Sequence, residues 1–342
     1  IIIYIIKMNK PKYLLPSVYL HPLKKIYAEH FIDPVRMLSI VGLPPATLHA
    51  TNLEIDHVKY VQLVNESAKV CNEPLMGFLI GREFHLNNIG YLGILLSHQK
   101  VLSNIYPIID YLFNHQRRGA RHYLKEQGSR AFHYIEFLIE DLVDCKQAAL
   151  LTISAYQNFF SEILGERWQS QKVYLRIRQP AKYQLLEKHF GCPVLFEQAH
   201  DAIEFSAKLS YEESQAEVGY SNEGTKEINL ALQSIPDLGQ LVTCYIDYFL
   251  NEKRPTKHDV ADSLGVHPKF LQKQLNSRGL TFNSLLEQCI FSRAKMLLMD
   301  TELPISQIAI ELGYSDARAF IRPFKKWSGY TPLQWRKHHF TH

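Results

Sequence analysis

The sequence predicts an α+β amino-terminal domain with a small antiparallel sheet, followed by an all-α domain with two helix-turn-helix motifs joined by a long helix. Three observations lead to this prediction. At 342 residues the chain is too long for one small hydrophobic core. The first ~210 residues mix helical and strand-like hydrophobic patterns, and the last quarter contains one helical pattern twice. The hydrophobic fraction of 46% and the charged fraction of 21% are typical of globular proteins.

The first residues, "IIIYIIKM", are apolar but short. Six apolar residues precede Lys7, whereas a helix needs about 20 to cross a bilayer. The stretch also lacks the small-residue cleavage site of a secretory signal. Because Met8 is the first methionine, we expect residues 1–7 to be an upstream extension, and we expect no association with a membrane.

Helical patterns recur through the expected first domain, residues 8–211. Asp33-Pro34 predicts the start of a short helix, because Asp caps helices well and Pro is favoured at the first helical position. Longer helices are predicted where apolar residues recur at helical spacing, over residues 55–71, 101–116 and 146–165.

Strand patterns lie in the second half of the same domain. Residues 120–138, "ARHYLKEQGSRAFHYIEFL", predict a hairpin that turns at Gly128-Ser129. Residues 172–179, 193–198 and 202–208 also alternate as strands do. Helices together with these strands predict an α+β domain with a small antiparallel sheet.

A polar segment separates this domain from the next. Residues 212–236 are polar and contain two glycines, which is typical of a boundary between domains. We therefore expect a linker over residues 212–236 and a second domain over residues 237–342.

Positive charge is concentrated in the second domain. From Asn251 onward there are 14 lysines and arginines against 8 acidic residues, a net charge of +6. The rest of the chain has 24 against 26, a net charge of −2. A basic domain joined to a slightly acidic one favours a module that binds a polyanion.

The last quarter contains the same skeleton twice. "VADSLGVHPKFLQKQL" (260–275) and "IAIELGYSDARAFIRPF" (308–324) share the sequence apolar-Ala-x-x-Leu-Gly with a constant offset of 48. After the turn, Leu271 and Leu275 correspond to Phe320 and Phe324 with an offset of 49, so the second turn is one residue longer. Each copy predicts a helix, a tight turn and a second helix.

The turns and helix ends of each copy carry suitable residues. We place the first motif at about 257–277 and the second at about 304–327. In the second motif Pro304 suits the first helical position, Gly313 suits a left-handed helix end and Asp316 suits the cap of the next helix. His267-Pro268 has the capping role in the first motif, and Thr281 caps the helix predicted over residues 281–299 between the motifs.

One copy alone is equally consistent with a plain helical hairpin, in which Ala and Gly only allow close packing. Two copies favour DNA binding. The helix between them has about 19 residues and spans about 28 Å. Major grooves recur about every 34 Å on one face of DNA. Two second helices held that far apart could therefore enter successive grooves.

The last domain resembles the DNA-binding domain of the AraC/XylS family of bacterial transcription regulators. The resemblance covers about residues 246–337 and rests on "SRAKMLLMDTELPISQIAIELGYSDARAFIRPFKKWSGYTPLQWRK", including Arg293-Ala294 and the closing Gly-x-x-Pro. Residues 75–114 and 190–210 resemble the amino-terminal effector domain called the arabinose-binding type, which differs from the sugar-binding cupin barrel of the arabinose regulator.

The resemblance implies a cytoplasmic, nucleoid-associated regulator, with promoter DNA, RNA polymerase and a small-molecule effector as partners and with a homodimer as its assembly. It fixes neither the effector nor the promoter. Two alternatives stay open for the amino-terminal domain: it serves only for dimerisation, or it is an enzyme domain tethered to DNA.

The resemblance also places residues on the DNA. The base-contacting residues it implies are Lys269, Gln272, Lys273, Arg318, Ala319 and Arg322. Arg suits guanine, Gln suits adenine and Ala suits the thymine methyl group. Phosphate contacts are expected from Lys325, Lys326 and Arg336. Such contacts set the register of the protein on DNA and do not read its sequence.

The apolar face of the same segment is expected to be core. Phe320, Phe324 and Trp327 recur at helical spacing on the face opposite the arginines. Pro323 lies among them, and an interior proline removes a backbone hydrogen bond at a cost of about 3 kcal/mol. Either Pro323 bends the helix along the groove, or the regular part of the second helix of this motif is shorter than expected.

No catalytic motif favours an enzyme. The chain has no GxSxG, HExxH or glycine-rich phosphate loop. Scattered acidic and histidine side chains are more typical of exposed or hydrogen-bonded positions than of catalysis, and the ones in question are His122, His133, Glu136, Glu140 and Asp141.

Cofactor and ligand residues are equally sparse. The five cysteines are far apart, show no metal-ligand spacing and lack the Pro-Cys setting of DNA-repair methyltransferases. We expect reduced thiols, no metal and no cofactor. Arg176 and Arg178 would share one face of a strand and are the candidates for binding a carboxylate ligand if that face points inward; an outward, solvated face is the alternative.

Overall fold

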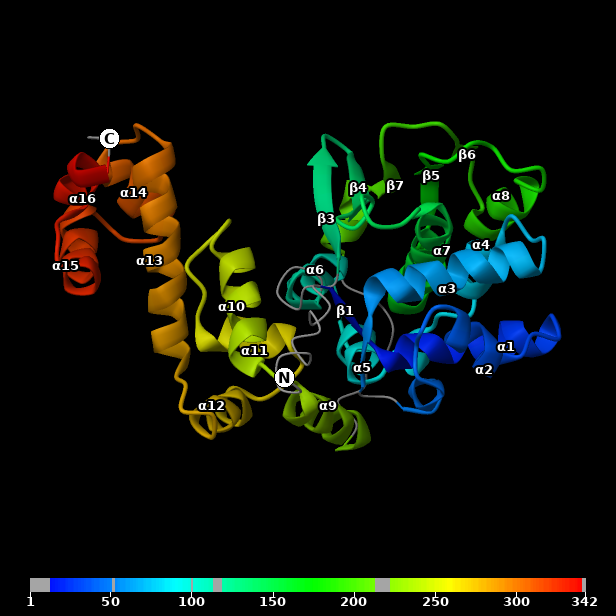
Figure 1. Cartoon of the computed structure of the whole chain (residues 1–342). Coiled ribbons are helices and arrows are strands. Elements are labelled where there is room, and N and C mark those ends of the chain that lie inside the picture. Colours follow the sequence, from blue (N-terminus) through cyan, green and yellow to red (C-terminus); the bar gives the residue numbers. More distant parts are fainter. Residues whose placement is uncertain (1–12, 51–52, 100, 113–118, 213–221, 340–342) are drawn as a thin grey trace, which may run out of the picture. The chain divides into compact units, whose positions relative to one another are not determined.

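The computed structural model describes residues 13–50, 53–99, 101–112, 119–212 and 222–339, and Figure 1 shows the course of the chain. Contacts divide the chain into two compact units, Ile1–Ser234 and Ile235–His342. The expected extension, residues 1–7, and residues 213–221 of the expected linker lie outside the described residues. The two units are described separately below.

The first part of the amino-terminal unit is helical. Strands β1 (Leu14–Pro16) and β2 (Glu54–Asp56) pair antiparallel, and the remaining elements of this part are α1 (His21–Glu29), α2 (Pro34–Ile40), α3 (His57–Val70), α4 (Met76–Gly81), α5 (Tyr91–Ser97) and α6 (Tyr106–Asp110). Asp33 caps α2 through the Val35 amide, as expected. The helix expected over residues 101–116 is instead a 3-10 turn at Leu102–Ile105 followed by α6, with residues 113–118 not described.

A five-stranded sheet forms the second part of this unit. Its strands are β3 (Ala120–Gln127), β4 (Arg130–Phe137), β5 (Ser170–Tyr174), β6 (Val194–Leu195) and β7 (Asp201–Ser206), in the order β3-β4-β7-β5-β6. The predicted hairpin is confirmed, because β3 and β4 pair from Gln127 with Arg130 outward. All the strand pairs of this sheet are antiparallel except β5 with β6. The short helix α8 (Gln184–Phe190) precedes β6.

Helix α7 (Lys146–Leu164) is the central helix of this unit. It contacts β7 of the sheet as well as α3, α4 and α5. Its contact with α4 requires glycine on α4, because a Cβ at Gly77 would lie 2.0 Å from the Gln147 carbonyl oxygen. The backbones of α4 and α7 therefore approach more closely than side chains would allow.

Helix α9 (Asn222–Ser234) lies within the segment expected to be a linker. Ile228, Ala231 and Leu232 are buried and spaced as one helical face, and α9 packs on α5. The contacts that divide the chain place the boundary after Ser234. The polar composition of this segment concealed a helix that belongs to the amino-terminal unit.

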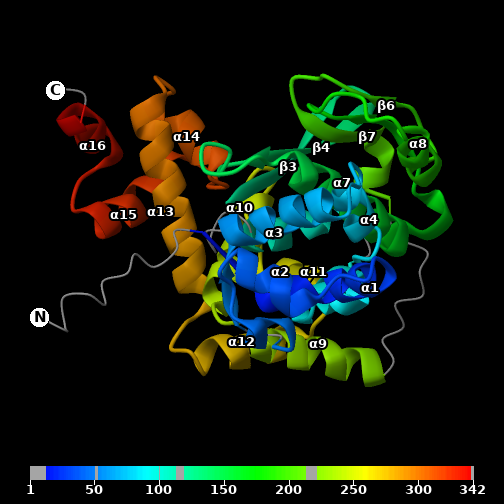
Figure 2. The same cartoon turned by 45° about the vertical axis from the view of Figure 1, so that its right-hand side comes forward.

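The carboxy-terminal unit is all helical. Its helices are α10 (Leu238–Phe249), α11 (Lys257–Ser263), α12 (Pro268–Asn276), α13 (Phe282–Asp300), α14 (Ile305–Glu311), α15 (Ala317–Ser328) and α16 (Pro332–His339). Figures 1 and 2 both show α13 running from α12 at one end to α14 and α15 at the other. This confirms two helix-turn-helix motifs joined by a long helix; α16 was not predicted.

The local signals at the helix ends act as expected, with one shift. Thr281 caps α13 through the Ser284 amide, and Asp316 caps α15 through the Ala319 amide at 2.9 Å. Gly313 ends α14 with φ at +75°, a conformation that suits glycine. Pro304 is the cap of α14, one residue before the helix begins.

The core of the second motif lies under α15. Phe320 and Phe324 are fully buried, whereas Trp327 is half-buried and donates its indole N–H to Glu287 at 3.2 Å. Helix α15 continues through Pro323 to Ser328. The second interpretation of Pro323, a shorter regular helix, is therefore wrong.

Candidate functional site

One face of α15 is exposed and basic. Arg318, Arg322, Lys325 and Lys326 are exposed and, with Ile321, line a shallow groove. Ala319 is also exposed. The segment places four cations on the side of the helix opposite its buried phenylalanines, and the described residues give none of the four an ion-pair partner in the groove. Their charge is available to a polyanion.

The corresponding face of α12 is less uniform. Lys269 and Lys273 are exposed. Gln272 is half-buried, donates to Asn276 Oδ1 at 2.7 Å and accepts from Lys257 Nζ at 3.3 Å. Each bond uses one of the two N–H groups or one of the two oxygen lone pairs, so one donor and one acceptor position of this carboxamide stay available for a base edge.

The two motifs contact each other away from α13. The Arg254 guanidinium, in the loop before α11, stacks over the Tyr314 ring at 4.9 Å from the ring centroid. A Cβ at Gly313 would lie 2.6 Å from the Arg254 Cβ. The loop that enters the first motif therefore packs on the turn of the second motif.

Arg336 has a packing role. It is half-buried on α16 and donates its Nε to the Leu298 carbonyl at 3.3 Å. That bond ties α16 to the end of α13, so the structure supplies this guanidinium with a partner inside the protein.

The arginines expected on a strand face lie beyond the strand. Strand β5 ends at Tyr174, so Arg176 and Arg178 do not share a strand face. Arg176 forms an ion pair with Glu140 at the edge of a polar cavity of about 300 Å³. Arg178 has 94% of its side chain exposed, with Glu197 at 3.9 Å. The expectation of a shared strand face is wrong because the chain leaves the sheet two residues earlier.

The side chains considered for catalysis do not form a single group, although the rings of His122 and His133 lie with centroids 5.7 Å apart. His122 and His133 are buried on the sheet, whereas Glu136 accepts from the Tyr123 hydroxyl at 2.7 Å and Glu140 pairs with Arg176. Burial lowers the pKa of His133 to about 3, and burial beside His133 and His57 holds the pKa of His122 well below its usual range. Both imidazoles are neutral at pH 7.

An apolar cavity of about 90 Å³ lies inside the amino-terminal unit. Its walls come from β1, α3, α5, α6, β3, β4 and α7, and none of the described residues that line it is Asp, Glu, Lys or Arg. The wall includes His57, His122, Phe84, Ala155 and Tyr156. Sequence patterns gave no signal for this cavity, because segments far apart in the chain form it.

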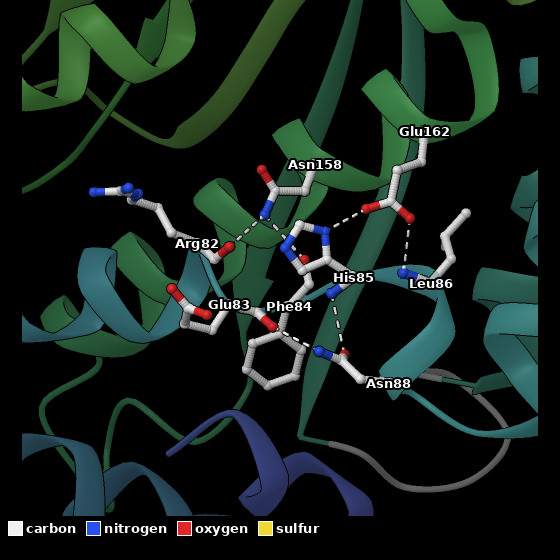
Figure 3. A network of polar contacts seen from close by, with 8 residues as sticks. All are labelled: Arg82, Glu83, Phe84, His85, Leu86, Asn88, Asn158 and Glu162. Atoms are coloured by element: carbon white, nitrogen blue, oxygen red, sulfur yellow. Dashed lines mark hydrogen bonds and ion pairs between the residues drawn. The ribbon is translucent and has the colours of Figure 1, made fainter. Parts of the chain in front are cut away.

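A network of polar contacts fixes one wall of this cavity (Figure 3). Asn158 of α7 donates to the carbonyls of Arg82 and Phe84, both at 2.9 Å. Glu162, one turn further on, binds His85 Nδ1 at 2.6 Å and the Leu86 amide at 3.0 Å. The loop after α4 is thereby held on α7, and Phe84 is held at the cavity.

The buried imidazoles predict a pH dependence of stability. A histidine whose pKa is lower in the folded than in the unfolded state, near 6.5, stabilises the fold above pH 6.5 and loses that contribution as the pH falls. Between pH 6.5 and 4.5 the amino-terminal unit is expected to lose up to about 1.4 kcal/mol per pH unit for each such group. Urea unfolding at several pH values, read by hydrogen exchange of α7, measures this loss.

His133→Gln is expected to flatten that dependence below pH 6.5, and His49→Gln, at an exposed position, serves as its control. Equal slopes for the two variants would contradict a contribution from burial of His133.

The described parts of the chain contain no helix long and apolar enough to cross a membrane. Within the same residues, no group of three or more His, Cys, Asp or Glu side chains is arranged to hold a metal ion.

Two family models match the chain. Residues 32–211 match the family described as the arabinose-binding domain of AraC transcription regulator, amino-terminal, and residues 260–338 match a helix-turn-helix domain family. The first match covers the amino-terminal unit from α2 to β7 and leaves out β1, α1 and α9, and the second begins within α11 and covers the rest of both motifs.

Two similar proteins are named as regulators, and the match covers most of the length of each. The chain is 22% identical to the ornithine utilization regulator of Pseudomonas aeruginosa, covering 96% of this chain and 98% of that protein. It is 24% identical to the HTH-type transcriptional regulator VirS of Mycobacterium tuberculosis, over 89% and 91% of the two chains.

Among solved structures, the transcriptional regulator CdpR from Pseudomonas aeruginosa matches with 20% identity and a TM-score of 0.46, over 92% and 96% of the two chains. The family matches, the repeated motif and the exposed basic helix agree with one another. The chain is therefore a member of the AraC family of DNA-binding transcription regulators, in the branch with an arabinose-binding-type amino-terminal domain.

Proposed function

We propose that this regulator reads promoter DNA with α12 and α15 and that a small-molecule effector in the cavity of the amino-terminal unit controls its DNA binding. The observation that carries the proposal is the combination, in one chain, of a double helix-turn-helix unit with a unit that contains an apolar cavity. Small-molecule sites are concave and lined mainly by apolar and aromatic side chains, and the lining of this cavity has that character.

The proposed DNA contacts follow the exposure of each side chain. Base contacts come from Arg318, Ala319 and Arg322 on α15 and from Lys269 and Lys273 on α12, all exposed. Gln272 joins them through the donor and acceptor positions that Asn276 and Lys257 leave available. Lys325 and Lys326 hold phosphates, and Arg336 keeps its packing role. Helix α13, with 19 residues, sets a separation of about 28 Å that suits successive major grooves.

Control by the effector would pass through α5. Leu96 of α5 lines the cavity, and α5 packs on α9. Helix α9 ends at Ser234, and α10 of the DNA-binding unit begins at Leu238. A ligand that prefers one position of α5 would shift α9 and, through the short connection, the population of chains competent to bind DNA.

The regulator would act in the cytoplasm on the bacterial nucleoid, as a homodimer that contacts RNA polymerase. Two copies bring two DNA-binding units to neighbouring half-sites, and the second binding event then gains from a high effective concentration. The alternative for the amino-terminal unit is dimerisation without an effector.

A cavity-filling variant tests effector control. Genome-wide binding of the tagged protein first identifies target promoters, and growth conditions that alter their transcription are then found. Ala155 is buried on α7 at the cavity wall, so Ala155→Leu is expected to abolish the response of the promoter to those conditions while the protein still binds the promoter in a mobility-shift assay.

Ala28→Leu is the matched control, because Ala28 is exposed on α1, and it should respond like the wild type. A full response in Ala155→Leu would support the dimerisation-only alternative. The enzyme alternative does not fit a family whose similar members are named as regulators.

A further inference from the structure

The walls of the apolar cavity restrict the chemistry of what can enter it. None of the described lining residues carries a fixed charge. Transfer of an unpaired carboxylate or ammonium group from water into such surroundings is strongly unfavourable. A ligand with a permanent charge therefore has no counter-charge at this wall.

The wall also contains uncharged polar side chains. The polar lining residues are Tyr19, His57, Tyr60, His122, Thr152 and Tyr156. Burial holds the pKa of His122 well below its usual range and that of Tyr156 well above. The rings of His122 and Tyr156 pack together with centroids 5.1 Å apart, so two neutral polar side chains lie side by side in the cavity wall.

The size of the cavity limits the ligand further. Its volume is about 90 Å³, whereas an apolar cavity of about 150 Å³ holds benzene. The enclosed part of a ligand would therefore be on the order of four non-hydrogen atoms in this conformation. Asn158 and Glu162 hold the wall at Phe84 in place, which opposes enlargement on that side.

We infer that the cavity takes a small neutral molecule with an apolar body and one hydroxyl or carbonyl group, the chemistry of a short-chain alcohol, ketone or aldehyde. The apolar body lies against the aliphatic and aromatic wall, and the single polar group bonds to the polar side chains of the wall. This inference rests on the proposed effector control and adds the ligand class to it.

Matched probes test the ligand class. The full-length protein is titrated at pH 7.5 and constant ionic strength with 1-butanol, 2-butanone, butyrate and butylammonium, which share size and differ in charge. Melting temperature and calorimetric heat are recorded. The neutral pair is expected to bind saturably and to raise the melting temperature, since a ligand of the folded state stabilises it; the charged pair is expected to do neither.

Variants place the binding in the cavity. Ala155→Leu should abolish the saturable effect of the neutral pair, and Ala28→Leu should retain it. If Ala155→Leu fails to fold, the comparison of neutral and charged probes on the wild type still decides the ligand class. Binding of butyrate or butylammonium as tight as that of the neutral pair would overturn it, and so would absence of saturable binding by both neutral probes.

The outcome for the ligand class is separable from that for effector control. Loss of the promoter response in Ala155→Leu together with tight binding of a charged probe would keep effector control and reject the neutral ligand. Saturable neutral binding with an unchanged promoter response in Ala155→Leu would keep the ligand class and reject effector control.

Discussion

Replacing Arg322 with alanine is expected to weaken binding of the full-length protein to its specific operator by roughly 1–3 kcal/mol, or about 5- to 150-fold. The side chain is exposed on α15 beside Arg318, and a guanidinium in the major groove bonds guanine O6 and N7 together. Arg318→Ala should have an effect of the same size. Mobility-shift titrations against the operator and against unrelated DNA measure both.

Two control variants separate base reading from charge. Lys325→Ala should weaken specific and non-specific binding alike and reduce the salt dependence by about one unit of slope, as loss of a phosphate contact does. Lys172→Ala removes one positive charge at an exposed position on β5 and should leave operator affinity unchanged. If Arg322→Ala matched Lys172→Ala, Arg322 would not be a base contact.

Phe324→Ala is expected to lower the free energy of unfolding of the carboxy-terminal unit by roughly 3–5 kcal/mol. The ring is fully buried and packs against Phe320, Phe291 and Trp335 with centroids 5.4 to 6.0 Å apart. Its removal leaves a cavity between α13, α15 and α16, since these helices all contribute to its surroundings. Hydrogen exchange of the peptides covering α13 and α15, measured with increasing urea, follows this loss.

Phe31→Ala is the matched control. Phe31 is 97% exposed between α1 and α2, so its truncation removes little packing and should change the stability of either unit by less than about 0.5 kcal/mol. Protection of α15 in Phe324→Ala equal to that in Phe31→Ala would show that the ring does not support the second motif.

The DNA-binding unit was predictable because its signals are local. Asp316, Gly313 and Thr281 act on backbone groups within a few residues of themselves, and the repeat aligns Leu271 and Leu275 with the buried Phe320 and Phe324. Such short-range effects can be predicted from the residues next to each position. Trp327 shows the limit, because it is half-buried and its indole N–H bonds to Glu287, 40 residues away.

The cavity of the amino-terminal unit was not predictable, since its wall joins segments from Leu15 to Phe159. His122 and His133 were considered for catalysis because they are polar residues in a strand pattern. The structure shows that both rings are buried and pack against Tyr156. Helix α9 was different. The spacing of Ile228, Ala231 and Leu232 is a helical signal, and the polar residues around it concealed it.

The length of α13 has a consequence for promoters. The second helices of the two motifs, α12 and α15, lie at opposite ends of the 19-residue helix α13. The length of α13 therefore sets the distance between them. DNA turns once in about 10.5 base pairs, so each inserted base pair rotates one half of an operator by about 34° relative to the other half. If α12 and α15 both enter the major groove, as proposed, a base substitution changes one contact, whereas an insertion or deletion between the two contacted segments moves one segment out of register with the other.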